Sequence, residues 1–117
     1  MAKYAFVGGI LVDGTGAAPV QDSLVLVDDD KITYAGPRTE VPAGYEVEDC
    51  TGKTVMPGLI DTHLHFSGNL TDDDNDWVIE SVAQKQACAV KQSYDCLTHG
   101  LTTVCEIGRN GIALRDL

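Results

Sequence analysis

Basic residues are scarce in this sequence. Eight lysines and arginines stand against eighteen aspartates and glutamates, which gives a formal net charge of −10 over 117 residues. A chain with this charge is repelled by nucleic acid phosphates and by anionic lipid headgroups. The sequence also lacks an apolar run of about eighteen residues, the length that a membrane-spanning helix requires. We therefore expect neither nucleic acid nor a membrane as a partner.

A leader pattern and a disulfide pattern are missing as well. The apolar N-terminal stretch is interrupted by Gly8 and Gly9 and ends at Asp13, without a small-residue cleavage site. The sequence therefore predicts a cytoplasmic protein with reduced, mostly buried thiols. The four cysteines are too widely spaced for a Cys-x-x-Cys zinc site: Cys50, Cys88, Cys96 and Cys105.

Short strands are the main feature of the first half of the sequence. Residues 23–27 and 32–36 are rich in β-branched and apolar residues and flank an acidic turn, which predicts a hairpin. Together the strands predict the N-terminal part of a small β-sandwich over residues 1–56. Apolar or alternating segments bounded by turn residues occur at 4–12, 23–27, 32–36, 45–50 and 53–56.

The second half of the sequence predicts a strand, a long helix and another strand. Apolar residues at three- and four-residue steps predict a helix from about Asp76 to Thr98, capped by Asn75 or Asp76, and its unusual length leaves a break near its start open. His99 and Gly100 end that helix, with the glycine just past its last residue. Residues 101–107 then read as a strand, and residues 112–117 as the start of a second helix.

A His-x-His pair follows a Pro-Gly turn at the centre of the chain. Because side chains alternate along a strand, Asp61, His63 and His65 are expected to share one face. Two imidazoles about 7 Å apart along a strand can lean together and bind one metal ion at roughly 2.1 Å each. Taken alone, the pair is equally compatible with an exposed strand that carries two titrating histidines.

Two segments carry a resemblance to a known family. Residues 56–65, Met-Pro-Gly-Leu-Ile-Asp-Thr-His-Leu-His, resemble the first barrel strand of the amidohydrolase superfamily, and residues 100–104, Gly-Leu-Thr-Thr-Val, resemble its second. The whole pattern looks most like the imidazolonepropionase and prolidase-like branch. The resemblance implies an α/β protein in which residues 57–117 form the first two βα units of a TIM barrel, after the partial β-sandwich. A complete barrel needs about 250 residues, so the barrel is incomplete and its remainder lies in a longer protein or a second chain.

The resemblance also implies a site. His63 and His65 would be ligands of one or two divalent metal ions, most often zinc. Asp61 would orient a ligand imidazole, or alternatively bond to neighbouring backbone. The family's other ligands, a lysine, two histidines and a late aspartate that acts as base, are missing here, so no catalytic residue is assigned within this chain. Whether Glu106, at the end of the second strand, contributes a carboxylate stays open.

The expected function is that of the N-terminal segment of a metal-dependent hydrolase. Metal-activated water would cleave a C–N bond in a small amide, a dipeptide or a cyclic amide. The isolated chain is expected to be inactive, and to self-associate, as a homo-oligomer for example, through open strand edges and an uncovered helix face. The alternative is a non-catalytic truncated fragment or module that pairs with a separately supplied remainder of the barrel.

Overall fold

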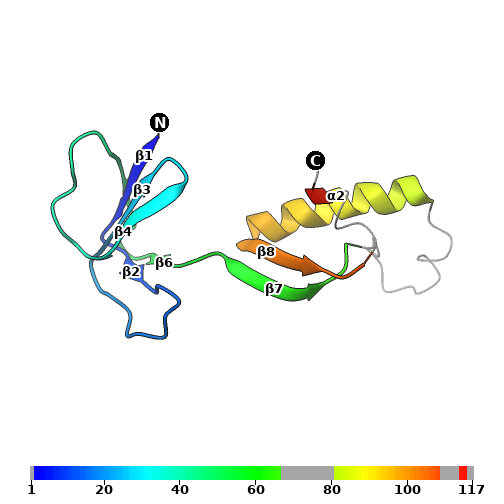
Figure 1. Ribbon diagram of the computed structural model, residues 1–117, viewed down its shortest axis with the longest axis horizontal. Helices are drawn as coiled ribbons and strands as arrows, with labels where there is room; N and C mark the ends of the chain where they lie inside the picture. Colours follow the sequence, from blue (N-terminus) through cyan, green and yellow to red (C-terminus); the bar gives the residue numbers. More distant parts are fainter. Residues whose placement is uncertain (1, 67–80, 109–113, 116–117) are drawn as a thin grey trace. The chain divides into compact units, whose positions relative to one another are not determined.

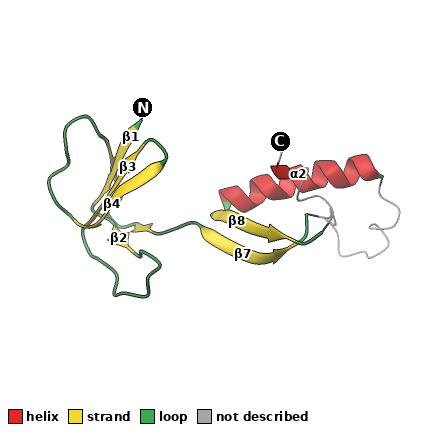
Figure 2. Cartoon of the chain, viewed as in Figure 1, coloured by secondary structure: helices red, strands yellow, loops and turns green. Residues whose placement is uncertain are grey.

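A computed structural model describes residues 2–66, 81–108 and 114–115, which divide at residue 57 into two compact units, Met1–Pro57 and Gly58–Leu117 (Figure 1). Strands and loops make up the first unit, and the second combines strands with a helix (Figure 2). None of the helices in the described ranges is long and apolar enough to cross a membrane. The elements are β1 Lys3–Val7, β2 Ile10–Leu11, β3 Ser23–Asp28, β4 Lys31–Pro37, β5 Glu46–Asp49, β6 Thr54–Val55, β7 Leu59–Leu64, α2 Val82–Thr98 and β8 Leu101–Glu106.

The first unit is built on a four-stranded sheet with the strand order β4-β3-β1-β5. The predicted hairpin is confirmed: β3 and β4 pair antiparallel, and Asp29 takes a positive φ of 57° in the turn between them. β1 pairs antiparallel with β3 and parallel with β5. The neighbour of β1 on one side is thus about forty residues away in sequence, which a local pattern does not reveal.

One face of this sheet forms the core of the first unit. Ala5 and Leu24 are fully buried and lie with Val7 and Leu26 in one apolar cluster. The alternation of β1 directs Ala5 and Val7 to the same face, so burial of this face follows from the strand period. Three partly buried side chains pack against the cluster: Tyr34, Val41 and Tyr45.

The apolar, strand-like segment predicted over residues 4–12 forms two strands, β1 and β2, and not one. The chain bends at Gly8, whose φ of 79° favours glycine, and a Cβ there would lie 2.8 Å from Thr51 Oγ1. β2 follows as a separate strand and pairs parallel with β6 in a second, two-stranded sheet. The buried Ser23 hydroxyl secures the bend by donating to the Gly9 carbonyl at 2.8 Å. The β-sandwich itself stays a prediction.

The turn after β2 contains a carboxylate, that of Asp13, which should make the stability of the fold depend on pH. The pKa of Asp13 lies below its ordinary value of 3.8 because the backbone N–H of Thr15, and then its hydroxyl, donate to the carboxylate. A lowered pKa stabilises the fold above the unfolded-state pKa, and this stabilisation is lost as the pH falls through the folded-state value. We expect Thr15→Val to raise the pKa of Asp13 and to weaken the dependence of stability on pH below about 4. A carboxyl NMR titration measures this, and an unchanged Asp13 curve would contradict it.

The second unit has the strand–helix–strand order expected from the sequence. β7 and β8 pair parallel, and α2 links them and lies along β8 (Figure 1). The backbone N–H of Leu59 donates to the Gly100 carbonyl at 2.8 Å, which joins the beginnings of the two strands. Gly100 has a φ of 87° just past the helix, as predicted for a glycine that ends it.

The predicted helix is interrupted near its start, where the sequence left a break open. Ser81 has an extended backbone (φ −67°, ψ 156°), so no helix runs continuously from Asp76 to Thr98. A capping box sets the true start: the Ser81 side chain accepts from the Gln84 backbone N–H at 3.3 Å, and the Gln84 side chain accepts from the Ser81 N–H at 2.9 Å. The proposed caps Asn75 and Asp76 lie outside the described residues, as does most of the predicted second helix, of which residues 114 and 115 are helical.

Candidate metal centre

The two histidines of the His-x-His pair lie close together at the carboxyl end of β7. β7 ends at Leu64, so His63 is within the strand and His65 directly follows it. Their ring centroids are 5.2 Å apart and the ring planes meet at 79°. Both side chains are exposed. The structure therefore brings together two imidazole side chains at one strand end, in a place that solvent and ions can reach.

The chemistry of this pair suits a divalent metal. Imidazole nitrogens are common ligands of zinc, which usually takes four ligands at about 2.0–2.3 Å. Among residues 2–66, 81–108 and 114–115, no group of three or more His, Cys, Asp and Glu side chains is arranged to hold a metal ion. Two imidazoles from the described part of the chain would fill half of such a site.

Asp61 interacts with the backbone next to the pair. Its Oδ1 accepts a hydrogen bond from the backbone N–H of His63 at 2.9 Å. The pairing of β7 with β8 shifts register between Asp61 and Leu64, the same interval that contains this bond. Of the two roles considered for Asp61, bonding to neighbouring backbone is thus observed, and orienting an imidazole stays a proposal.

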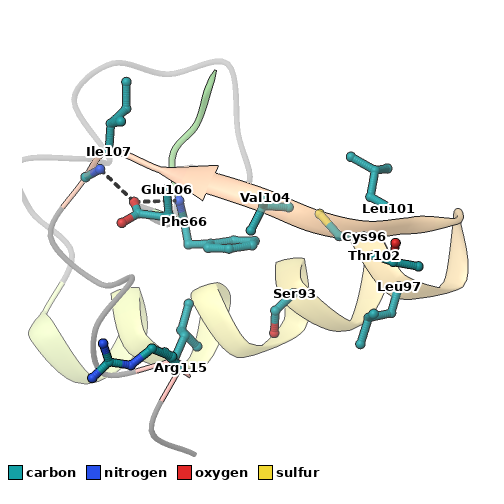
Figure 3. A pocket seen from close by; sticks show the side chains of 12 residues that line it. Phe66, Ser93, Cys96, Leu97, Leu101, Thr102, Val104, Glu106, Ile107 and Arg115 are labelled. Carbon is teal, nitrogen blue, oxygen red and sulfur yellow. Dashed lines mark hydrogen bonds between the residues drawn. The ribbon is translucent and has the colours of Figure 1, made fainter. Parts of the chain in front are cut away.

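Glu106 lies at the end of the neighbouring strand and connects the two strand ends. One carboxylate oxygen, Oε1, accepts from the backbone N–H of Phe66 at 3.3 Å and from that of Gly108 at 2.9 Å (Figure 3). The sequence left the role of this carboxylate open. The sequence carries little information about this role, because Glu106 can be placed beside Phe66 only once β8 is known to pair with β7.

His99 lies away from the pair, as its position in the sequence predicts. It caps the carboxyl end of α2, directly before β8 begins, and its Nδ1 lies 2.7 Å from the Asp95 carbonyl oxygen. Because β7 and β8 are parallel, His99 is near the beginnings of the strands whereas His63 and His65 are near their ends. His99 is therefore a poor candidate for a third ligand.

A pocket of about 750 Å³ lies between α2 and β8 (Figure 3). Phe66, which is only 5% exposed, points into it beside Val104. Neither histidine of the pair lines the pocket. Phe66 therefore anchors the end of β7 on the helix side of the sheet. The alternation of a strand would direct His63 and His65 to the opposite side.

Comparison with known proteins points to one family. A family model described as "Amidohydrolase family" matches residues 54–116, more than half of the chain, and the match includes β7, α2, β8 and both histidines. An imidazolonepropionase of Hyphomonas neptunium is 43% identical over 67 residues, which cover 50% of this chain and 16% of that protein. A 5-methylthioadenosine/S-adenosylhomocysteine deaminase of Symbiobacterium thermophilum is 40% identical over 73 residues, 60% of this chain and 17% of that protein.

The structural comparison agrees on the fold. The crystal structure of A. niger ochratoxinase superimposes with a TM-score of 0.81 at 21% sequence identity, over 98% of this chain and 28% of that protein. The chain is a mixed α/β structure, and it spans about a sixth of the length of the curated relatives that it matches.

Proposed function

Because the chain belongs to the amidohydrolase family, we propose that it forms the N-terminal segment of a metal-dependent hydrolase that cleaves C–N bonds. In this proposal residues 1–56 are part of a β-sandwich, and residues 57–117 provide the first two βα units of a TIM barrel. The observation that carries the proposal is the 5.2 Å separation of the His63 and His65 rings at the end of β7. In a TIM barrel, that end of the strands is where active sites lie.

Each residue of the site has a defined task in this proposal. His63 and His65 hold a divalent metal, most often zinc, through ring nitrogens. When bound, such a metal lowers the pKa of a coordinated water to about 7 and polarises a carbonyl group. Asp61 fixes the backbone at His63 through the hydrogen bond to its N–H, and a contact to an imidazole would add orientation of the ring.

The proposal needs groups from outside this chain. Two imidazoles leave a tetrahedral site half filled, and among the described residues no group of three or more His, Cys, Asp and Glu side chains completes it. The missing ligands and the base are assigned to the remainder of the barrel, in the same longer protein or in a second chain. For the substrate we propose a small molecule with a C–N bond at an unsaturated carbon, such as a cyclic amide, an amide or a dipeptide, since the relatives are named imidazolonepropionase and deaminase.

We expect the isolated 117-residue chain to show no zinc-dependent hydrolysis, and the chain joined to its complete barrel to show it. The reason is that the proposal assigns the general base and half of the ligands to the remainder of the barrel. The measurement is turnover of a panel of cyclic amides, N-acyl amino acids and dipeptides, with zinc and with a chelator. Clear zinc-dependent turnover by the isolated chain would contradict the division of the site between this chain and the remainder. A complete protein without any turnover would favour the alternative, a non-catalytic module.

A further inference from the structure

We propose that Glu106 is a positioning residue, which acts with Gly108 to fix the chain on both sides of His65 so that the histidine pair is held ready for metal. The inference rests on the proposed function, because it concerns the same pair. It assigns a role to a carboxylate whose contribution the sequence left open.

The hydrogen bonds at the strand ends enclose His65. On one side of it, the Leu64 carbonyl accepts from the backbone N–H of Ile107 at 3.1 Å. On the other side, the backbone N–H of Phe66 donates to Glu106 Oε1 at 3.3 Å. The residues before and after His65 are thus both tied to the end of β8, which limits rotation of the backbone that carries the ring.

The second bond to Glu106 fixes the carboxylate itself. Oε1 also accepts from the backbone N–H of Gly108 at 2.9 Å, so one oxygen joins the end of β7 to the segment after β8. Hydrogen bonds to an ionised carboxylate are stronger than those between neutral groups. Phe66 adds an anchor on the apolar side, because its ring is buried in the pocket against α2 (Figure 3).

Gly108 leaves the space that this arrangement needs. A Cβ at this position would lie 2.4 Å from Glu106 Oε1 and 3.3 Å from His65 Nδ1. The carboxylate and the imidazole of His65 therefore border the same small volume. Gly108 does not have the left-handed φ that favours glycine elsewhere in this chain, so the contact rather than the backbone conformation requires a glycine here.

Positioning by hydrogen bonds predicts a specific order of zinc affinities for variants of the complete protein. Glu106→Ala removes the acceptor, and we expect a loss of about 10-fold or more, the range seen when partners of metal ligands are removed. Glu106→Gln keeps an oxygen that can accept both N–H groups, so most of the affinity should remain. Gly108→Ala displaces the carboxylate without removing it and should weaken binding as Glu106→Ala does. Asp95→Asn, which also removes one negative charge from this unit, is the matched control and should bind zinc as the unchanged chain does.

Three readouts decide the proposal: zinc affinity by calorimetry, the helical circular dichroism signal, and the amide proton shift of Phe66 in NMR spectra recorded without metal. Glu106→Ala should move the Phe66 amide signal upfield, and Glu106→Gln should move it less. Unchanged zinc affinity in Glu106→Ala would overturn the proposal. A zinc affinity of Glu106→Gln as low as that of Glu106→Ala would also overturn it, because it would show that the negative charge acts on the cation directly. If Glu106→Ala loses its helical signal, it has unfolded and its zinc affinity does not test the proposal. The zinc affinity of Gly108→Ala, which keeps every hydrogen-bonding group, then tests it.

Failure of the proposed function gives a different result. If His63→Ala and the unchanged chain bind zinc equally, the histidine pair is not the metal site. If His63→Ala loses zinc while Glu106→Ala and Gly108→Ala keep it, the metal site stands and the positioning role of Glu106 is overturned.

Discussion

His63→Ala and His65→Ala are each expected to lower both the zinc affinity and the hydrolytic activity of the complete protein by well over 10–100-fold. Removing a partner that only orients a metal ligand costs about that much, and removing the ligand itself should cost more. The rings lie 5.2 Å apart at one strand end, so loss of either leaves a single imidazole from this chain. Metal analysis of the purified variants and their turnover at saturating zinc measure the effect.

His99→Ala is the matched control for this prediction. It removes the third histidine of the chain, which lies at the end of α2 with its Nδ1 2.7 Å from a backbone carbonyl oxygen. Its zinc content and activity should equal those of the unchanged protein. A His99→Ala variant that loses zinc while His63→Ala retains it would reverse the assignment of the ligands.

Gly58→Ala is expected to destabilise the second unit by about 1–3 kcal/mol, the usual cost of forcing an additional group into a packed position. A Cβ on Gly58 would lie 1.9 Å from Thr102 Oγ1 and 2.6 Å from Thr102 Cβ, so rotation of the threonine side chain does not relieve the overlap. The start of β7 must then move away from β8, against the bond from Leu59 to the Gly100 carbonyl. Urea unfolding followed by circular dichroism of α2 measures the loss.

A double-mutant cycle tests the cause of that loss. Thr102→Gly removes the three atoms that lie nearest to a Cβ on Gly58. Introduced together, the two changes should therefore cost less than the sum of the single changes. Costs that simply add would show that Gly58 is needed for another reason than its close approach to Thr102.

Local sequence signals predicted those parts of the fold that depend on neighbours in the chain. The hairpin of β3 and β4 follows from two apolar runs around an acidic turn, and Gly100 ends α2 as expected. The start of α2 was missed because the acidic residues before it suggested an earlier cap, although Ser81 and Gln84 carry the capping-box pattern. The parallel pairing of β1 with β5 has no local signal, since it joins residues about forty positions apart.

For the candidate site, too, the sequence predicted what depends on neighbouring residues and not what depends on strand pairing. His63 and His65 were found from a spacing of two residues in one strand, and the structure places their rings together. The role proposed for Glu106 depends on the pairing of Leu64 with Glu106 across two strands. The pairing of β7 with β8 shifts register twice before it reaches Leu64 and Glu106, and a single sequence does not specify such shifts.

The most direct measurement is an anomalous diffraction map at the zinc edge from crystals of the complete protein grown with zinc. We expect a peak about 2.1 Å from a ring nitrogen of both His63 and His65, with its other ligands supplied from beyond residue 117. A zinc peak coordinated without these two rings would contradict it.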